Sequence, residues 1–223
     1  MKAFILAGGE GKRLHPYTKI FPKPLLPIND EPILSLILKH LKKYEIDEVI
    51  LATNYKAPLL KIYFGDGSEF GIKINYSKEE KILGTAGPLK LVEDQLKEDF
   101  IVMNGDILTD LNINKLIKFH KTESPDITVV CKKEEVLLNY GMIESNGENI
   151  IDWKEKPTLN VEISTGIYIL NPSVIKHIDK DEMIDMPDLV KRIIKSNGKV
   201  LKFMYEGKWI DIGRIDTYQK AQS

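Results

Sequence analysis

Short apolar runs alternate with segments of helical periodicity along the first half of the chain. The apolar runs predict β-strands at residues 2–7, 48–53, 72–76 and 100–103. The periodic segments predict helices near residues 33–44, 56–63, 86–96 and 113–120. In the first helix, apolar side chains recur with the spacing of one buried face, at Leu34, Ile37, Leu38 and Leu41. This alternation is typical of an α/β domain with a mixed, mostly parallel sheet flanked by helices.

After residue 126 the pattern shifts towards strands. They are expected at residues 127–131, 140–144, 149–153, 163–170, 200–205 and 209–212. Asn146-Gly147 separates two of them, and this dipeptide favours the tight turn of a β-hairpin. Helices are expected near 173–178 and 185–196, and a short one at the end of the chain. With no repeat and no flexible linker, residues 1–223 are expected to form a single domain. An open α/β half at residues 1–125 would share its core with a mixed lobe at 126–223.

Composition excludes several classes of protein. The 32 basic and 33 acidic residues leave a formal charge of −1, so the chain has no global attraction to nucleic acid or to an anionic membrane. The single cysteine excludes an intrachain disulfide and suits a reducing compartment. No apolar run approaches the ~18–20 residues that span a bilayer. We therefore expect a cytoplasmic protein with neither nucleic acid nor membrane as a partner.

A glycine-rich segment follows the first predicted strand directly. It reads Leu6-Ala7-Gly8-Gly9-Glu10-Gly11-Lys12-Arg13-Leu14. A Walker A loop would need a glycine at position 6 and a hydroxyl at position 13, and a Rossmann fingerprint would need a glycine at position 14, so both assignments fail. A loop with glycines and cations at the carboxyl end of a strand is still suited to binding phosphate oxygens through backbone N–H groups. An ordinary tight turn with surface charges is the alternative.

A proline-rich segment comes next and includes a further cation. Prolines at positions 22, 24 and 27 restrict the backbone on both sides of Lys23. We expect this lysine to be held on a fixed path, exposed in a cleft beside the glycine loop, where it would contact phosphate.

These two segments resemble the signature of the sugar-phosphate nucleotidyltransferases. The resemblance is carried by Gly8-Gly9-x-Gly11-x-Arg13-Leu14-x-Pro16-x-Thr18 and Phe21-Pro22-Lys23-Pro24-Leu25-x-Pro27. Further matches extend over nearly the whole chain: Leu83-Gly84-Thr85-Ala86-Gly87, Asn104-Gly105-Asp106, Tyr140-Gly141, Glu155-Lys156-Pro157, Thr165-Gly166-Ile167-Tyr168 and Trp209-Ile210-Asp211-Ile212-Gly213. The resemblance implies a GT-A-like (Rossmann-like) fold and Mg²⁺-dependent transfer of a nucleotidyl group from an NTP to a sugar 1-phosphate, with release of pyrophosphate. The first half of the chain would bind mainly nucleotide and the second half mainly sugar phosphate.

The resemblance also implies a role for each matching residue. Arg13 and Lys23 would be catalytic contacts of the phosphates, and Asp106 and Asp211 would bind Mg²⁺. The nucleotide would contact Leu6, Ala7, Gly8, Gly9, Gly11, Arg13, Glu79, Gly84, Thr85 and Asn104. The sugar phosphate would contact Gly141, Glu155, Lys156 and Gly166. Without the family, Asp106 and Asp211 are equally typical of turns or helix caps, and Glu155-Lys156-Pro157 of an exposed strand end.

The identity of the base is a finer question. Glu79 matches a position where thymidylyl- and uridylyltransferases of the family carry a base-reading glutamine, and a carboxylate can accept both N–H groups on one edge of guanine. GTP is therefore favoured, with UTP, CTP or dTTP as alternatives. A non-catalytic nucleotide-sugar-binding protein and a glycosyltransferase are the competing classes. Because the extensions that make tetramers in larger relatives have no counterpart in the sequence, we expect a monomer or a homodimer.

Overall fold

The computed structural model describes residues 1–222 and contains a seven-stranded mixed sheet. Its order is β12-β8-β11-β6-β1-β4-β5. Strand β1 pairs in parallel with β4 and β6, and β4 with β5, whereas β11 runs antiparallel to both β6 and β8. The strands are β1 (Ala3–Leu6), β4 (Glu48–Thr53), β5 (Lys73–Lys78), β6 (Phe100–Asn104), β8 (Ile127–Leu137), β11 (Thr158–Leu170) and β12 (Val200–Met204). The predicted α/β class is confirmed.

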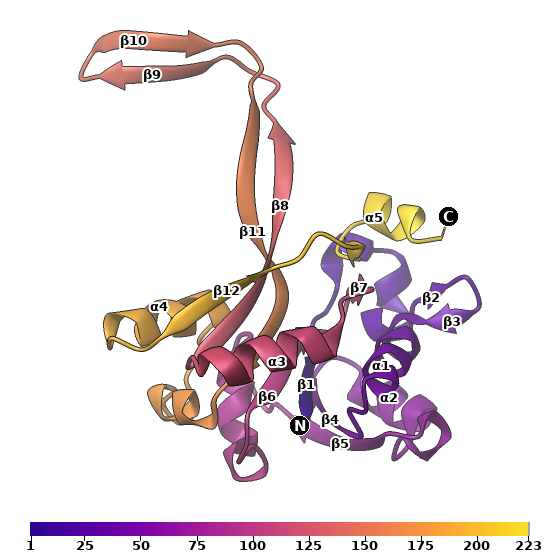
Figure 1. The fold of residues 1–223 in the computed structure, drawn as a ribbon. Helices are drawn as coiled ribbons and strands as arrows, with labels where there is room; N and C mark the ends of the chain where they lie inside the picture. The colour runs from indigo at the N-terminus through magenta and orange to yellow at the C-terminus, as the bar shows by residue number, and fades with distance from the viewer. Residues whose placement is uncertain (223) are drawn as a thin grey trace.

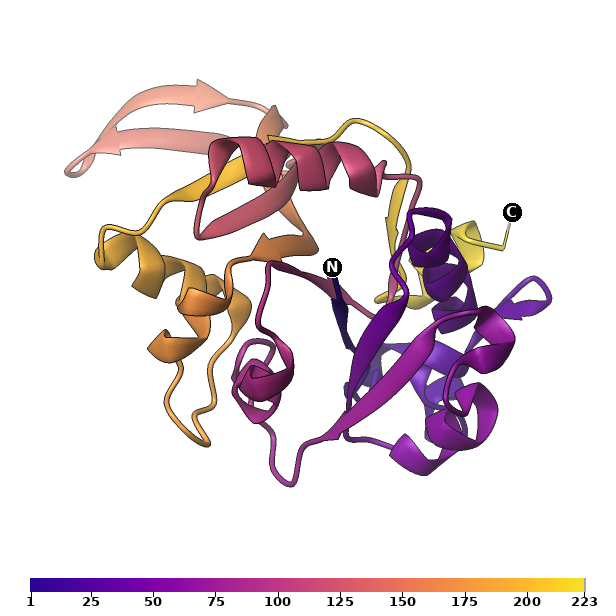
Figure 2. The ribbon, with the colours of Figure 1, turned by 60° about the horizontal axis from the view of Figure 1, so that its bottom comes forward.

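Helices cover both faces of this sheet (Figure 2). They are α1 (Ile33–Lys43), α2 (Ala57–Phe64), α3 (Ile113–Glu123), α4 (Met186–Lys195) and α5 (Ile215–Lys220). Two segments predicted as helices are instead 3₁₀ turns, Gly87–Gln95 and Pro172–His177. Within the first, Val92 has non-helical backbone angles, so the segment forms two short 3₁₀ turns across a kink and no continuous helix.

The hydrophobic core lies in two layers, because successive side chains of a strand point to opposite faces of the sheet. In β1, Ala3 and Ile5 belong to the layer that includes α1, and Phe4 belongs to the layer that includes α4. The four apolar positions predicted for one face of the first helix are all buried. These two layers fix the sheet, and with it the positions of the loops at its carboxyl edge.

A two-stranded arm extends from this body (Figure 1). Strands β8 and β11 continue past the sheet as a ribbon, and the hairpin of β9 (Met142–Asn146) and β10 (Asn149–Lys154) lies at its far end, turned aside. The predicted hairpin is confirmed, but its two-residue turn is Gly147-Glu148, one residue later than predicted, because Asn146 still pairs with Asn149. Gly147 has φ +61°. The strands β8 and β11 are longer than predicted. Their outer parts pair with each other away from the core, so they lack the apolar character by which a buried strand is recognised.

Two short pairs of strands complete the fold. β2 (Pro27–Ile28) pairs with β3 (Glu31–Pro32), and β7 (Ile107–Thr109) pairs with β13 (Trp209–Asp211). The second pair joins segments about one hundred residues apart in sequence. None of the helices within residues 1–222 has the length and apolar character needed to cross a membrane.

Candidate active site

A cavity of about 600 Å³ lies at the carboxyl ends of β1, β4 and β6. Open α/β sheets bind their ligands at this edge. Most of the residues predicted from the sequence line the cavity, namely Leu6, Ala7, Gly8, Gly9, Gly11, Arg13, Lys23, Glu79, Gly84, Thr85, Asn104 and Asp106. The structure therefore brings the predicted nucleotide-binding residues together with both predicted catalytic cations.

The glycine loop is held close to its neighbours. Gly11 has φ +63°, and a Cβ atom there would lie 2.9 Å from Cγ2 of Thr18. The buried Thr18 hydroxyl donates a hydrogen bond to the carbonyl of Gly11 at 2.8 Å. Gly9 has nothing within 4 Å of its Cβ position, so its backbone is open on that side. Thr18 thus fixes a loop whose glycines leave room for a phosphate to approach the backbone.

Lys23, Asp106 and Asp211 form a charged cluster beside this loop. Lys23 Nζ pairs with Asp106 Oδ2, and its side chain is only 12% exposed. The prediction that Lys23 is exposed in the cleft is therefore wrong, since the ion pair draws it inward. The pairing of β7 with β13 brings Asp211 opposite Ile107, and Ile212 N donates to Asp106 O at 3.0 Å. Two aspartates distant in sequence thereby become neighbours.

Arg13 approaches the same cluster from the glycine loop. A Cβ atom at Gly213 would lie 3.1 Å from Arg13 Nη2 and 3.0 Å from Asp211 Oδ1, so both groups border one small space. Burial and the neighbouring Asp106 carboxylate raise the pKa of the Asp211 carboxyl, while Lys23 and Arg13 oppose the rise. The four side chains thus interact electrostatically, and three of them line the cavity, whereas Asp211 is not among its lining residues.

The two aspartates fit a magnesium ion. Asp106 Oδ1 and Asp211 Oδ1 are both buried and have no hydrogen-bond partner among the described residues. A buried carboxylate oxygen without a partner is costly, and a cation would satisfy it. No cluster of three or more His, Cys, Asp or Glu ligands occurs within residues 1–222. Two carboxylates suit Mg²⁺, which is often held by one or two carboxylates together with substrate phosphates and water.

Glu79 follows β5 and turns its carboxylate towards the glycine loop. Only 8% of the residue is exposed, and its Oε2 accepts a hydrogen bond from Leu83 N at 3.2 Å. Its Oε1 would lie 3.3 Å from a Cβ atom at Gly8. Burial raises the pKa of the Glu79 carboxyl, and the hydrogen bond from Leu83 opposes this only in part. One carboxylate oxygen is anchored and the other borders the cavity, an arrangement that leaves acceptor capacity for a ligand.

The segment after Glu79 packs tightly against the start of α4. Gly84 has φ +77°, and a Cβ atom there would lie 2.5 Å from the carbonyl oxygen of Ile184. Thr85 Oγ1 donates to Asp185 Oδ1 at 3.1 Å and accepts from Met186 N at 2.8 Å. The Thr85 hydroxyl is thus engaged in the first turn of α4, although the residue lines the cavity. Gly84 is required by this close approach of two backbones.

Asn104 and Gly166 meet at the point where β6 adjoins β11. Gly166 has φ +75°, and a Cβ atom there would lie 2.5 Å from Asn104 Nδ2. Asn104 also lies beside Leu6 in the register of β1 and β6. Gly166 is therefore the one predicted sugar-phosphate residue that lies next to the cavity lining.

The other predicted sugar-phosphate residues lie on the arm. Gly141, Glu155 and Lys156 belong to the far end of the ribbon, and none of them lines the cavity. Gly141 packs against the indole of Trp153, whose Nε1 donates to Glu155 Oε2 at 3.3 Å. The eight residue steps of extended strand from Gly166 to Thr158 span about 25 Å. The structure thus separates these residues from the cavity that contains the predicted nucleotide-binding residues.

Other residues of the cavity were not predicted as site residues, among them Asn54 and Tyr55. Asn54 and Tyr55 follow β4 and line the cavity. Tyr55 N donates to Gly8 O at 3.4 Å, and the Tyr55 hydroxyl donates to Thr18 O at 3.2 Å. No motif marks these two residues, but the strand order does, since residues that directly follow a parallel strand next to β1 reach the same edge of the sheet.

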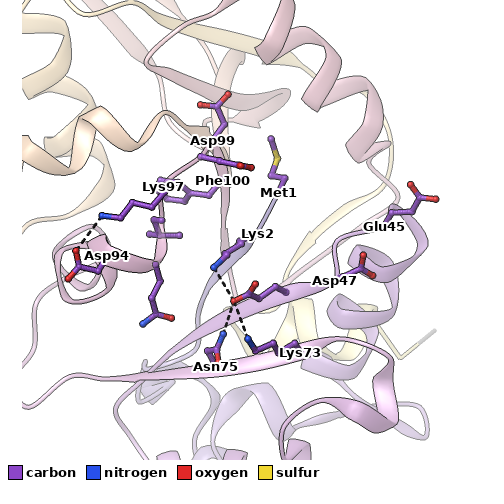
Figure 3. A pocket seen from close by; sticks show the side chains of 14 residues that line it. Met1, Lys2, Glu45, Asp47, Lys73, Asn75, Asp94, Lys97, Asp99 and Phe100 are labelled. Atoms are coloured by element: carbon purple, nitrogen blue, oxygen red, sulfur yellow. Dashed lines mark hydrogen bonds and ion pairs between the residues drawn. The ribbon is translucent and has the colours of Figure 1, made fainter.

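A second cavity of about 680 Å³ lies at the opposite edge of the sheet (Figure 3). Its cations are already paired: Lys2 lies 3.0 Å from Glu48 Oε1, and Lys97 lies 3.3 Å from Asp94 Oδ1. Asn75 also donates to Glu48 at 2.9 Å. This second cavity has neither a glycine loop nor a charge cluster suited to phosphate, so the cavity at the carboxyl edge fits the predicted phosphate chemistry better.

Comparison with known proteins agrees with this geometry. The sequence profile of the nucleotidyl transferase family matches residues 2–223. A UTP–glucose-1-phosphate uridylyltransferase of Synechocystis sp. is 33% identical, covering 99% of this chain and 62% of that protein. A mannose-1-phosphate guanyltransferase of Debaryomyces hansenii is 38% identical, covering 96% and 61%. The chain thus spans less than two thirds of the length of these curated relatives.

Solved structures show the same fold. A putative glucose-1-phosphate thymidylyltransferase of Bacillus anthracis superposes with a TM-score of 0.82 at 26% identity, covering 100% of this chain and 94% of that one. HddC of Yersinia pseudotuberculosis, complexed with GMP-PN, superposes with a TM-score of 0.79 at 25% identity, covering 99% and 97%.

Proposed function

The chain belongs to the nucleotidyl transferase family, and from that premise we propose that it transfers a nucleotidyl group from an NTP to a sugar 1-phosphate. A phosphate oxygen of the sugar 1-phosphate forms a bond to the α-phosphorus of the NTP. The bond from that phosphorus to the bridging oxygen of the β-phosphate breaks, and pyrophosphate leaves. The curated relatives are named for this chemistry with glucose or mannose 1-phosphate.

The observation that carries the proposal is the charge cluster beside the glycine loop. Two anions must approach each other in this reaction, so the site needs positive charge where negative charge develops. Arg13 from the loop and Lys23 from the proline-rich segment both line the cavity. Arg13 would contact the departing pyrophosphate, and its planar guanidinium can bind two phosphate oxygens together. Lys23 would release Asp106 and contact the α-phosphate or the acceptor phosphate.

Asp106 and Asp211 would hold Mg²⁺. When bound, the ion would polarise phosphoryl oxygens and neutralise part of their charge. The two buried oxygens without partners are the groups that would face it. Lys23 meanwhile stabilises the ionised form of Asp211 and pairs with Asp106, so the carboxylates are partly compensated before a cation arrives.

Glu79 supports a preference for guanine. Guanine presents N1–H and N2–H donors on one edge, and the Glu79 Oε1 that borders Gly8 is an acceptor close to the loop. A pyrimidine presents one imide N–H between two carbonyls and fits a carboxylate less well. We therefore propose GTP as the preferred donor, with UTP, CTP and dTTP as the alternatives that a substrate panel tests.

The partners we propose are small molecules in the cytosol. The near-neutral charge argues against nucleic acid and anionic membrane, and the single cysteine suits a reducing compartment.

The test is a panel of the common NTPs and sugar 1-phosphates, read by pyrophosphate release with and without Mg²⁺. The expected result is magnesium-dependent release from GTP with one sugar 1-phosphate, and none when either substrate is omitted. Asp106→Asn should lower turnover by about 10²-fold or more while the fold, followed by circular dichroism, is unchanged. A folded protein that releases no pyrophosphate with any pair contradicts the proposal. Tight nucleotide-sugar binding without turnover, unchanged in Asp106→Asn, would instead support a sensor.

A further inference from the structure

The ends of β4 and β5 place Asn54 beside Glu79. The two strands pair in parallel, and their register ends with Thr53 opposite Lys78, so Asn54 and Glu79 are the next residues on each strand. Hydrogen bonds hold the strands together at this point. Glu79 N donates to Thr53 O at 3.2 Å, and the buried Thr53 hydroxyl donates to Ser77 O at 3.1 Å. The two side chains that follow therefore start from adjacent positions at the carboxyl edge of the sheet.

Both residues border the same small space beside Gly8. A Cβ atom at Gly8 would lie 3.3 Å from Glu79 Oε1, 3.3 Å from Asn54 Cβ and 3.2 Å from Asn54 N. Both residues also line the cavity of about 600 Å³. The glycine at position 8 keeps this space open. A ligand that enters it meets a carboxylate oxygen and, next to that oxygen, the side chain of an asparagine.

The segment that carries Asn54 is fixed by its backbone and by Tyr55, whereas the Asn54 side chain is free. Tyr55 N donates to Gly8 O at 3.4 Å, and the Tyr55 hydroxyl donates to Thr18 O at 3.2 Å. Ala57 N donates to Asn54 O at 3.3 Å. Within residues 1–222, the half-buried side-chain amide of Asn54 has no hydrogen-bond partner. Its two N–H donors and its acceptor are therefore available to a ligand in the cavity.

A carboxylate next to an amide matches one edge of a keto base. Guanine presents N2–H, N1–H and the O6 oxygen in a row along one edge. A carboxylate accepts from the N–H groups, and an amide N–H donates to the keto oxygen. Adenine and cytosine have an amino group in place of that oxygen and lack the ring N–H beside it. The same pair of side chains would therefore disfavour them.

We propose that Asn54 is a specificity-determining residue whose Nδ2 donates a hydrogen bond to O6 of guanine, while the Glu79 carboxylate accepts from N1–H and N2–H. A carboxylate alone cannot recognise the keto oxygen, whereas the pair recognises the oxygen and the adjacent N–H together. This inference rests on the proposed function, because it requires a nucleotide whose base lies between the glycine loop and Glu79. It does not depend on GTP being the preferred donor, since O4 of uracil also lies next to a ring N–H.

The first experiment combines changes in the residue with changes in the base. Binding is measured by isothermal titration calorimetry without a sugar 1-phosphate, using GTP, inosine triphosphate and the triphosphate of 2-aminopurine riboside. The inosine nucleotide keeps O6 but lacks the 2-amino group, whereas the 2-aminopurine nucleotide keeps the amino group but lacks O6. Asn54→Ala should weaken binding of the first two by about tenfold each, as for one lost hydrogen bond, and change binding of the third by less than about twofold.

Two further variants sharpen the test. Asn54→Asp keeps the size of the side chain but replaces the N–H donor with an acceptor, so it should weaken GTP binding more than Asn54→Ala does. Asn75→Ala is the matched control, because Asn75 lies on β5 but donates to Glu48 at 2.9 Å at the opposite edge of the sheet (Figure 3). The control should bind all three nucleotides as the wild type does. Circular dichroism verifies that each variant is folded.

Two outcomes overturn the proposal. Equal weakening of all three nucleotides by Asn54→Ala shows that Asn54 shapes the loop without contacting the base. Unchanged GTP affinity in Asn54→Asp shows that no donor is needed at this position.

A comparison of UTP with CTP separates this inference from the proposed preference for GTP. If the wild type prefers UTP, Asn54→Ala should weaken UTP by about tenfold and leave CTP unchanged, because CTP has an amino group in place of O4. The contact then stands while the proposed base fails. A wild type that binds ATP or CTP as tightly as GTP and UTP refutes the contact. Pyrophosphate release in the substrate panel still decides the proposed transfer, since the titrations contain no acceptor.

Discussion

At the residue scale, the Glu79 carboxylate, which we propose to bind the nucleotide, is maintained at a cost in stability. Its raised pKa means that the folded state binds the proton more tightly than the unfolded chain does. The stability of the fold therefore decreases as the pH rises through the raised pKa, and at neutral pH the ionised carboxylate is a destabilising group. Such a group is retained where a ligand needs its charge.

Glu79→Gln is accordingly expected to raise the melting temperature at pH 7 and to weaken GTP binding. Glutamine keeps an acceptor for Leu83 N–H but carries no charge to desolvate. The gain in melting temperature should shrink as the pH falls and the wild-type carboxyl becomes protonated. Differential scanning fluorimetry between pH 4 and 8, together with GTP titration, measures both effects. A lower melting temperature at pH 7 would show that the charge is stabilising.

Lys23 is expected to be required for turnover. Lys23→Ala removes a cation from the cavity and leaves Asp106 beside Asp211 with less compensation, so kcat should fall by about 10²-fold or more. Lys19→Ala changes an exposed lysine of the same proline-rich region and serves as the control, with kcat within about twofold of the wild type. Equal losses in both variants would mean that only the general positive charge of the segment matters.

At this scale, the sequence predicts which side chains line the cavity better than it predicts how exposed each side chain is. Arg13, Lys23 and Asp106 were recognised from motifs, and the structure brings them to one cavity. The inward position of Lys23 was not predicted, because it depends on an ion pair with a residue 83 positions away. Asn54 and Tyr55 belong to no motif and become visible only once the strand order is known.

At the scale of elements, the close packing of the loop after Glu79 against the start of α4 limits which side chains the loop can carry. Gly84 combines a left-handed backbone with a neighbouring carbonyl 2.5 Å from its Cβ position. Alanine there would meet backbone, which has little room to move. The absence of a side chain at Gly84 thus allows the loop after Glu79 to pack closely against the segment that leads into α4, the helix that carries Leu189.

Gly84→Ala should therefore destabilise the fold by more than a left-handed alanine does alone. Gly71→Ala is the matched control, since Gly71 has φ +64° but a Cβ atom there would meet only the flexible end of the Lys42 side chain, with Cε at 3.4 Å and Nζ at 4.0 Å. The control should cost about 1 kcal/mol, and Gly84→Ala at least about 2 kcal/mol in urea unfolding. Equal costs for the two variants would show that the loop moves aside freely.

Element types were largely predictable, and element lengths were not. The apolar strands of the sheet were predictable, because strands that are buried on both faces have nearly continuous apolar sequences. The outer halves of β8 and β11 were not recognised, since residues such as Lys133 and Glu162 pair outside the core. The segment at residues 87–95 has helical periodicity, but it forms 3₁₀ turns with a break in the helical backbone at Val92, which the periodicity does not reveal.

At the scale of the whole molecule, the body and the arm are separable. Every residue of the two core layers lies outside residues 138–157. Leu137 and Thr158 are paired directly, so an Asn-Gly type I′ turn can join them in place of residues 138–157, which include the hairpin of β9 and β10.

The protein in which Asn-Gly replaces residues 138–157 is expected to fold and to bind GTP, with a melting temperature within a few degrees of the wild type. Pyrophosphate release should be lost, because Glu155 and Lys156 are absent. Thermal unfolding, GTP titration and the pyrophosphate assay test the three parts in turn. Retained turnover would show that the body alone handles the sugar phosphate, and failure to fold would show that the arm stabilises the core.

The pairing of β7 with β13 has a consequence for when the proposed site is completed during protein synthesis. The glycine loop, β6 and Asp106 emerge from the ribosome early, whereas Asp211 arrives about one hundred residues later and is positioned only when β13 aligns with β7. A nascent or truncated chain that stops before β13 would have the nucleotide-binding edge but only one of the two carboxylates. Such a chain is expected to bind an NTP without hydrolysing or transferring it, so unfinished copies would not consume nucleotide.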